Sequence, residues 1–324
     1  MAVSTRERTT PAAPERRAAT RATGRRRGGA RFTRGDKAVL ATMIGVPTLL
    51  HVGFVWLPAV GSIVLSFSRW DGIGGLNTIK WIGLRNYREI VSIYPPFWPA
   101  VQHNLLWLVF FILVPTVFGL FLAVLLDKEI RFGRVYQSVL YLPVLISLAL
   151  IGFIWTLVYA PEQGLLNNLL GRTEPGQAID WFGNPSINIW SVLVAASWRH
   201  VGYIMILYLA GLKSVDTSLR EAAALDGANE FRSFVHVIFP ALRPINIIVL
   251  VVTVIESLRA FDLVYVINKG TNGLELLSVL VTNNILGEAS RIGYGSALAV
   301  ILLVVSLGFI ITYLVQVFRK ELRA

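Results

Sequence analysis

Six long apolar segments dominate this 324-residue sequence and limit what the chain can fold into. About 20 apolar residues, rising 1.5 Å each, cross the ~30 Å hydrocarbon core of a bilayer. Backbone groups inside a bilayer must bond to one another, so each segment is expected to be a helix. The expected spans are residues 38–67, 101–126, 135–159, 187–212, 244–267 and 294–318. The sequence therefore predicts an all-α integral membrane protein with six transmembrane helices.

The composition agrees with a membrane protein and excludes several other classes. Only 15% of the residues are charged and 55% are hydrophobic, whereas an ordinary soluble domain carries about 25% charged residues. The absence of cysteine excludes a disulfide-stapled scaffold and a thiolate metal site. The four histidines fall in four different segments, so we expect no metal site.

Residues 1–37 form a separate basic region before the first apolar segment. Arg, Ala, Thr, Gly and Pro dominate it, so it offers little to bury and is predicted to be a disordered tail. Its arginines favour a topology signal that contacts anionic membrane lipid, with a simple solvated tail as the alternative. Nucleic acid is the least favoured partner, because no aromatic side chains are interleaved for base stacking.

The distribution of Lys and Arg among the connections predicts the orientation. The tail, the connections at 127–134 and 213–243, and the C-terminus are basic, whereas the opposite loops mix both signs of charge. Cytoplasmic loops carry the excess of Lys and Arg. We therefore expect a multi-pass protein of the plasma membrane with both termini in the cytoplasm, and a permease domain over residues 38–324.

No nucleotide or catalytic motif is found in the sequence. The phosphate-cradling pattern G-x-x-x-x-G-K-[ST] is absent, as are the zinc-protease, serine-hydrolase and kinase patterns. We therefore predict no enzymatic activity and no catalytic residues for the chain itself. If the protein uses ATP, a separate subunit must bind it.

The connection at 213–243 is the most informative stretch. Residues 221–225 favour a helix, and Asp216, Thr217 or Ser218 can cap its start. Gly227 can adopt backbone angles that turn one short helix into the next.

An apolar stripe follows this turn. Phe231, Phe234, Val235 and Ile238 recur at helical spacing, and Pro240 and Pro244 are expected to end this helix and start the next span. The pattern predicts a helix–turn–helix with an exposed apolar face, which invites a protein partner.

This loop resembles the signature E-A-A-x-x-x-G-x(9)-I-x-L-P of importer-type ABC permeases, in the sugar-permease family typified by maltose and glycerol-phosphate importers. Val237 and Phe239 replace the usual Ile and Leu. The positions that match, together with the Asp typical of the carbohydrate branch, are Glu221, Ala222, Ala223, Asp226, Gly227 and Pro240.

The resemblance extends over almost the whole chain after the tail. Segments similar to the carbohydrate branch lie at 66–70, 82–87, 141–143, 161–167 and 261–266. Residues 268–272 depart from the usual T-x-G-G-P. The matches keep their order and spacing, which makes the resemblance specific.

What the resemblance implies is a permease subunit that moves a carbohydrate, such as a di- or oligosaccharide, by alternating access. The 213–243 loop would be the coupling loop that docks on an ATPase. Partners implied are a second permease in a heterodimer, two copies of a cytoplasmic ATPase that bind ATP and Mg, and an extracellular solute-binding protein.

Four ionisable residues lie within the predicted spans, where charge is costly unless it faces a cavity or a partner. They are Arg199, Glu256, Arg259 and Asp262. The last three follow one another at three-residue steps, which places them on one side of a continuous helix. We favour pairing among the four over direct contact with a sugar.

The resemblance also implies sugar contacts on the fourth and fifth spans. The matching positions, with Glu256 added for its carboxylate, are Ala196, His200, Tyr203, Thr253, Glu256, Ser257 and Ala260. Tyr203 could stack on a pyranose ring, and the polar side chains supply donors and acceptors. Alternatively, Tyr203 only packs against a helix, and Thr253 and Ser257 bond to their own helix.

An ion-coupled secondary transporter of a small polar solute is the alternative function. Such a protein would carry inverted repeats and a coupling carboxylate near the bilayer midplane. Glu256 is the only good candidate, no internal repeat is evident, and the 213–243 loop would be unexplained.

Overall fold

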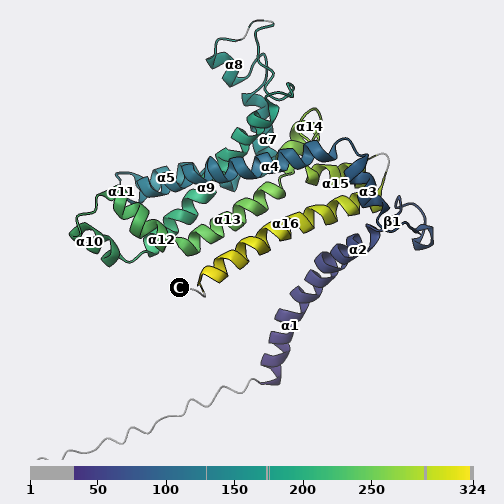
Figure 1. Ribbon diagram of the computed structural model, residues 1–324, viewed down its shortest axis with the longest axis horizontal. Coiled ribbons are helices and arrows are strands. Elements are labelled where there is room, and N and C mark those ends of the chain that lie inside the picture. Colours follow the sequence, from purple (N-terminus) through teal and green to yellow (C-terminus); the bar gives the residue numbers. More distant parts are fainter. Residues whose placement is uncertain (1–32, 129, 173, 175, 288–289, 322–324) are drawn as a thin grey trace, which may run out of the picture. The chain divides into compact units, whose positions relative to one another are not determined.

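The computed structural model describes residues 33–128, 130–172, 174, 176–287 and 290–321 (Figure 1). It divides into two compact units, one up to Trp56 and one from Leu57 onward. In the first unit, helix α1 (Arg34–His51) continues into a π-helical turn, η1 (Val52–Trp56). None of its described residues is buried, as expected for an apolar helix that lipid surrounds.

Helix α1 starts within the region predicted to be a tail. Thr33 and Asp36 form a capping box, in which each side chain accepts the other residue's backbone N–H. This cap starts the helix at Arg34, four residues before the predicted span. The rest of the predicted tail, 1–32, lies outside the described residues.

Four of the six predicted spans are confirmed as long apolar helices. The candidate spans cover Arg34–Leu65, Phe97–Asp127, Asn188–Ser214 and Ile292–Gln316. They comprise α1, η1 and α2 (Leu57–Leu65), then α4 (Phe97–Leu113) with α5 (Pro115–Asp127), then α9 (Asn188–Ser214), and finally α16 (Ile292–Glu321).

The third predicted span, 135–159, is not one continuous helix. Helix α6 (Gly133–Tyr141) and the 3₁₀ turn η3 (Leu142–Leu145) meet α7 (Leu148–Val158) at a bend of 102°. Ile146 is extended after Pro143, and the Ser147 hydroxyl then caps a new helix by accepting the N–H of Leu150. The prediction was wrong because hydropathy records the apolar run but not the break.

The fifth predicted span, 244–267, is also interrupted. Helix α13 (Arg243–Leu258) ends where the backbone leaves the helical ladder, and α14 (Asp262–Asn268) begins after Phe261. Before it, α12 (Phe239–Ala241) meets α13 at a bend of 73°. Counting each bent pair as one span gives up to six spans among the described residues.

Short elements occupy the connections that the charge pattern predicts to be external. Strands β1 (Ser68–Arg69) and β2 (Lys80–Trp81) pair antiparallel, with the 3₁₀ turn η2 (Leu76–Thr78) between them. Three helices follow that the hydropathy pattern does not predict: α3 (Arg85–Ser92), α8 (Leu165–Leu169) and α15 (Leu277–Leu286).

The core of the second unit lies between its long helices (Figure 1). One apolar cluster joins α4, α7, α9 and α14, and another joins α5, α9, η4 (Phe234–Ile238) and α13. Gly119 lets α5 approach α9 closely, since a Cβ there would lie 2.9 Å from the side chain of Ile204. Large apolar side chains of α16, such as Val304 and Ile311, stay exposed, as a lipid-facing surface requires.

Candidate functional site

The 213–243 loop begins with helix α10 (Thr217–Leu225), and the side chain just before the helix fixes its start. The carboxylate of Asp216 accepts a hydrogen bond from the N–H of Ser218 at 2.9 Å. Of the three predicted caps, Asp216 is therefore the one used. The hydrogen bonds from Ser218 hold the pKa of the exposed Asp216 carboxyl below its usual value.

Gly227 ends α10 in the predicted turn. Its φ of 74° lies in the left-handed region that residues with a Cβ rarely adopt. The N–H of Gly227 bonds to the carbonyl of Ala224 at 3.1 Å, and the N–H of Ala228 bonds to that of Ala223 at 3.0 Å. This pair of bonds is the Schellman motif. No atom lies within 4 Å of a Cβ built at Gly227, so the backbone angle, and not lack of space, requires glycine.

The second half of the loop contains α11 (Glu230–Ser233), then η4 and α12. The residues of the predicted apolar stripe do not share one face of these elements. Phe234 and Ile238 pack in the core, whereas Phe231 and Val235 are exposed. The stripe was predicted for a regular α-helix, but η4 is a wider π-helical turn that rotates these positions apart.

Pro240 does not end the helix, contrary to the prediction. It lies within α12, and the chain turns only at Leu242, before Pro244 in the first turn of α13. Proline cannot donate to the helical ladder, and the wider π turn just before it accommodates the missing bond.

The outer surface of the loop combines apolar and polar groups. Glu221 and Ala222 are exposed, whereas Ala223 is buried. Leu225 and Phe231 are 90% and 75% exposed, which is unusual for large apolar side chains in an ordered helical elbow. The loop therefore presents an ordered helical surface from which two apolar side chains protrude.

An ion pair ties α10 to the end of α5. A carboxylate oxygen of Asp127, whose side chain is only 12% exposed, lies 2.8 Å from Nη1 of Arg220 on α10. Lys213 lies 4.0 Å from the other oxygen, and Arg220 also donates to the carbonyl of Leu212 at 3.2 Å. Sequence reasoning used Lys213 and Arg220 only to assign orientation and missed this contact, because its partners are far apart in the chain.

A cavity of about 230 Å³ lies between α4, α7, α9, α13 and α14. It brings together seven residues that the sequence singled out: Ala196, Arg199, His200, Glu256, Arg259, Ala260 and Asp262. Aromatic and apolar residues that sequence reasoning missed complete the lining: Trp107, Phe111, Leu148, Phe261 and Leu263. We call this space the intramembrane cavity.

Two of the four charged groups in the intramembrane cavity form an ion pair. Nη1 of Arg199 lies 3.5 Å from a carboxylate oxygen of Glu256. Arg259 and Asp262 form no ion pair within the described part of the chain. The predicted common helix side fails for Asp262, because α13 ends at Leu258 and Asp262 starts a new helix.

The break between α13 and α14 is stabilised from neighbouring helices. The hydroxyl of Ser278 on α15 donates to the carbonyl of Ala260. The side-chain amide of Asn104 on α4 donates to the carbonyl of Ser257 at 3.3 Å, and its oxygen accepts the N–H of Leu277 at 2.9 Å. Irregular backbone at membrane depth persists only with such partners.

His200 is fixed in one orientation at the wall of the intramembrane cavity. It is 2% exposed, its Nε2 lies 3.2 Å from the hydroxyl of Thr253, and its ring centroid lies 4.5 Å from that of Phe111. The hydroxyl of Ser257 donates to the Thr253 carbonyl at 2.7 Å. Thr253 and Ser257 are thus fully buried supports of the wall and do not line the cavity.

Tyr203 lies away from the intramembrane cavity. It packs, partly buried, against the apolar cluster of α5, α9, η4 and α13. The structure therefore brings Ala196, His200, Glu256 and Ala260 to the cavity wall but leaves Tyr203 in a packing position.

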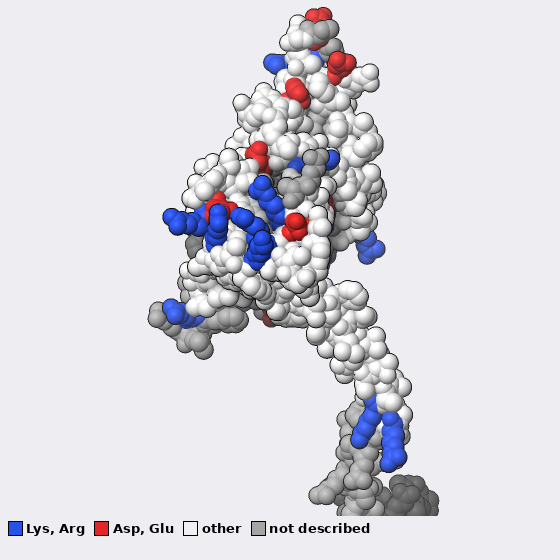
Figure 2. Space-filling model, turned by 90° about the vertical axis from the view of Figure 1, so that its right-hand side faces the viewer, with Lys and Arg blue, Asp and Glu red and all other residues white. Residues whose placement is uncertain are grey.

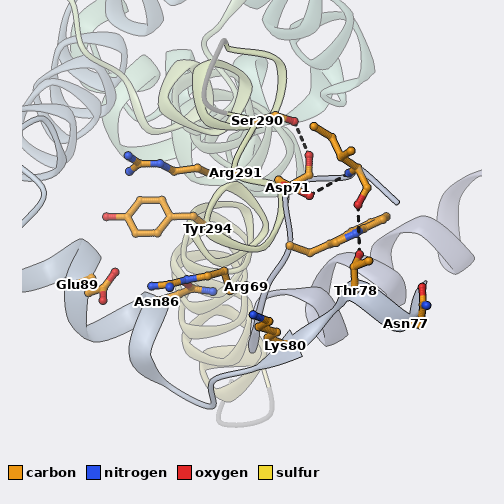
Figure 3. Close-up of a pocket in the computed structure, with 12 residues that line it drawn as sticks. Arg69, Asp71, Asn77, Thr78, Lys80, Asn86, Glu89, Ser290, Arg291 and Tyr294 are labelled. Carbon is orange, nitrogen blue, oxygen red and sulfur yellow. Dashed lines mark hydrogen bonds between the residues drawn. The ribbon is translucent and has the colours of Figure 1, made fainter. Parts of the chain in front are cut away.

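A second, more open pocket of about 860 Å³ lies beside the β1–β2 hairpin, and we call it the hairpin pocket. Figure 3 shows its lining from the hairpin, α3 and the start of α16. Three cationic residues, Arg69, Lys80 and Arg291, line it with the two carboxylates of Asp71 and Glu89. Sequence reasoning used these residues only for orientation.

Comparison with known proteins assigns the family. A family model described as "Binding-protein-dependent transport system inner membrane component" matches residues 84–324. The chain belongs to this family. It is therefore a multi-pass plasma-membrane protein and an ABC transporter permease, and the predicted family is confirmed.

Curated relatives support the same family along most of the chain. The xylose/arabinose import permease protein XacH of Haloferax volcanii is 33% identical over 89% of this chain and 91% of its own length. The arabinooligosaccharides transport system permease protein AraP of Bacillus subtilis is 30% identical over 78% of this chain and 80% of its own. Such relatives are transport proteins and not enzymes.

Solved structures show the same fold. A bacterial ABC transporter that imports the acidic polysaccharide alginate matches with a TM-score of 0.74 and 20% identity, over 88% of this chain and 96% of that one. The alginate transporter in complex with its alginate-bound periplasmic protein matches with a TM-score of 0.72 and 18% identity, over 86% of this chain and 93% of that one. The chain therefore has the mostly helical fold of an ABC importer permease.

Proposed function

We propose that this permease imports a carbohydrate, a di- or oligosaccharide, by alternating access driven by a separate ATPase. The single observation that carries the coupling is the geometry of the 213–243 loop. Its capped helix, its Schellman turn at Gly227 and its exposed Leu225 and Phe231 form a preformed surface for a protein partner. From here we call it the coupling loop.

The Asp127–Arg220 contact connects the coupling loop to the helices of the pore. The ion pair links α10 to the end of α5, and the Arg220 bond to Leu212 links it to the end of α9. Helix α9 continues from this contact to the wall of the intramembrane cavity, and α5 packs against α9 in the apolar cluster that they share. A displacement of the coupling loop would therefore move α9, which forms part of the cavity wall, as ATP-driven alternating access requires.

The lining of the intramembrane cavity favours a sugar ring as the transported substrate. Its wall combines Trp107, Phe111 and Phe261 with the polar groups of His200 and the Arg199–Glu256 pair. Aromatic faces beside hydrogen-bonding groups suit a sugar. At about 230 Å³ the cavity is smaller than the ~300–1,000 Å³ of a typical ligand site, so we assign it as one part of a site that a second permease completes.

The proposed assembly follows from these two roles, in which the coupling loop binds the ATPase and the intramembrane cavity forms part of the sugar site. Both termini and the coupling loop face the cytoplasm, where two ATPase copies bind ATP and Mg. A second permease forms the other half of the pore as a heterodimer partner, and an extracellular solute-binding protein delivers the sugar. The names of XacH and AraP, which concern xylose, arabinose and arabinooligosaccharides, support carbohydrate as the substrate class.

The deciding experiment measures uptake of a panel of labelled sugars by a deletion strain and by the strain carrying the chain. We expect loss of one sugar in the deletion strain, inhibition by vanadate, and no effect of collapsing the ion gradient while ATP is held constant. Glu221→Lys on the exposed face of α10 should abolish uptake and ATPase co-purification at a normal amount of inserted chain. Uptake that follows the ion gradient would support the secondary-transporter alternative.

A further inference from the structure

We infer that the hairpin pocket is a docking site for carboxylate side chains of the solute-binding protein. The inference rests on the proposed function, because it takes the hairpin to face the outside of the cell. It adds the location and the chemistry of the contact between the two proteins.

The first observation is an excess of unpaired positive charge. Arg69 and Lys80 form no ion pair or side-chain hydrogen bond with any described residue, and Arg291 only lies over the ring of Tyr294, 5.9 Å from its centroid. Figure 2 views the face that carries β1 and α3, where Lys and Arg side chains gather in larger number than Asp and Glu. An acidic partner would be drawn to such a face.

Both carboxylates at the rim already have partners. Asp71 accepts the N–H of Ile73 at 2.9 Å, and Glu89 accepts from Nε of Arg85 at 2.7 Å. Because Arg85 already offsets the charge of Glu89, Asp71 is the one carboxylate of the lining without a cationic partner among the described residues, and it faces three cations.

The second observation is a repulsive pair within the hairpin. Arg69 on β1 and Lys80 on β2 lie directly opposite each other in the register. Directly opposed residues of antiparallel strands project to the same face, and like charges in these positions destabilise the pair. No described carboxylate forms an ion pair with either side chain, whereas an anion bound between the two would relieve the repulsion.

The third observation is that the pocket is preformed. The side-chain amide of Asn86 on α3 donates to the carbonyls of Ser66 and Ser68, each at 2.8 Å. The hydroxyl of Ser290 donates to the carbonyl of Asp71 at 2.6 Å, which ties the hairpin to the segment before α16 (Figure 3). A rigid receptor loses little conformational entropy on binding.

Close packing at Gly293 holds the same junction. A Cβ at this position would lie 2.1 Å from the carbonyl oxygen of Ser68, so only glycine lets α16 approach the hairpin this closely. The N–H of Gly293 also bonds to the carbonyl of Trp70 at 3.2 Å. The cationic side chains therefore project from a hairpin that is held firmly against the start of α16.

Charge and size favour a protein over a free sugar as the occupant. A single uronate unit brings one carboxylate, whereas three cations from separate elements line a pocket of about 860 Å³. A folded protein surface can present several carboxylates at once. Charge complementarity of this kind raises the rate and specificity of docking.

The first test uses the absence of cysteine in the natural chain. In cells, Lys80→Cys should react with a membrane-impermeant maleimide and should cross-link to the binding protein through a short thiol-to-amine reagent. Arg172→Cys, in another predicted external loop, should be labelled equally but not cross-linked. No external labelling of either variant would overturn the proposed orientation. Labelling without a cross-link at position 80 would overturn the docking site alone.

The second test reverses the charges. Arg69→Glu combined with Lys80→Glu should lower uptake about tenfold at the native level of binding protein, and overproducing the binding protein should restore it. Arg69→Lys with Lys80→Arg, and the control Arg172→Glu, should take up sugar normally. The inference is overturned by unchanged uptake, or by a loss that excess binding protein does not restore although the chain is inserted normally. A defect relieved only by more free sugar would assign the pocket to the sugar instead.

Discussion

The coupling loop and the intramembrane cavity differ in how their structures are determined. In the coupling loop, each feature follows from residues a few positions apart, such as the Asp216–Ser218 cap and the turn at Gly227. In the cavity, the wall is assembled from five helices, and the groups that hold it come from distant parts of the chain. A locally determined element can be rigid on its own, whereas a wall built from several helices changes whenever one of them moves.

The sharpest test of a locally determined coupling loop is Gly227→Pro. Proline is restricted to φ near −65° and cannot adopt the observed 74°, so the turn must be rebuilt. Uptake should fall to background, and the ATPase should no longer co-purify. Gly171→Pro is the matched control, because Gly171 has a φ of 67° and open space around it but lies in a predicted external loop. Equal loss of uptake in both variants would contradict a special role for the coupling loop.

A second, smaller effect is expected where the coupling loop joins α5. Asp127→Asn removes the carboxylate that faces Arg220 and Lys213, so sugar transported per ATP hydrolysed should fall about tenfold. Adding Arg220→Met should recover part of the loss, because removing both partners leaves one unpaired charge fewer.

The exposed pair of Lys128 and Glu230 provides the control for this contact. Lys128→Gln should change the ratio of transport to hydrolysis by less than about twofold, since exposed ion pairs contribute little. If Asp127→Asn with Arg220→Met transported no more sugar per ATP hydrolysed than Asp127→Asn alone, the ion pair would not be what connects the coupling loop to α5.

For the intramembrane cavity, the expected effect is on affinity and not on coupling. Ala260→Leu adds volume to the wall of a 230 Å³ space and should raise the KM for uptake about fivefold, with transport per ATP unchanged. Tyr203→Phe, which removes a hydroxyl in a packing position, should leave the KM within about twofold. A larger rise in KM for Tyr203→Phe than for Ala260→Leu would instead assign the sugar site to the neighbourhood of Tyr203.

The smallest effect concerns the start of α10. Because the folded-state pKa of Asp216 lies below its usual 3.8, the capping contribution is fully present above that value and is lost as the pH falls through the lower, folded-state pKa. Hydrogen-exchange protection of α10 in the detergent-purified protein should therefore decrease only in strongly acidic solution. Asp216→Ser, which caps without titrating, should show no such decrease. A decrease near neutral pH would contradict the assignment of the cap.

The part of the fold that the sequence predicts is the part with a strong local signal. The helices α9 and α16 were predicted within a few residues, because a long apolar run has one stable form in a bilayer. The cap at Asp216 and the turn at Gly227 were predicted for similar reasons.

The breaks at 146–147 and 259–261 could not be read from hydropathy. Both lie inside apolar runs, and the second is stabilised by Asn104 and Ser278 from other helices. The same limit explains the candidate sites. The family resemblance assigned His200 to a sugar pathway, to which Glu256 was added for its carboxylate, but only the packing of five helices shows that Trp107 joins them and that Tyr203 does not.

The interrupted helix has a mechanical consequence. A continuous α-helix passes a push at one end to the other almost undiminished, like a stiff rod. The non-helical residues 259–261 separate α13, which follows the coupling loop, from α14, which packs with α7. Torque applied through the coupling loop would thus be absorbed as bending at Ala260, which lines the intramembrane cavity, before it reaches α14.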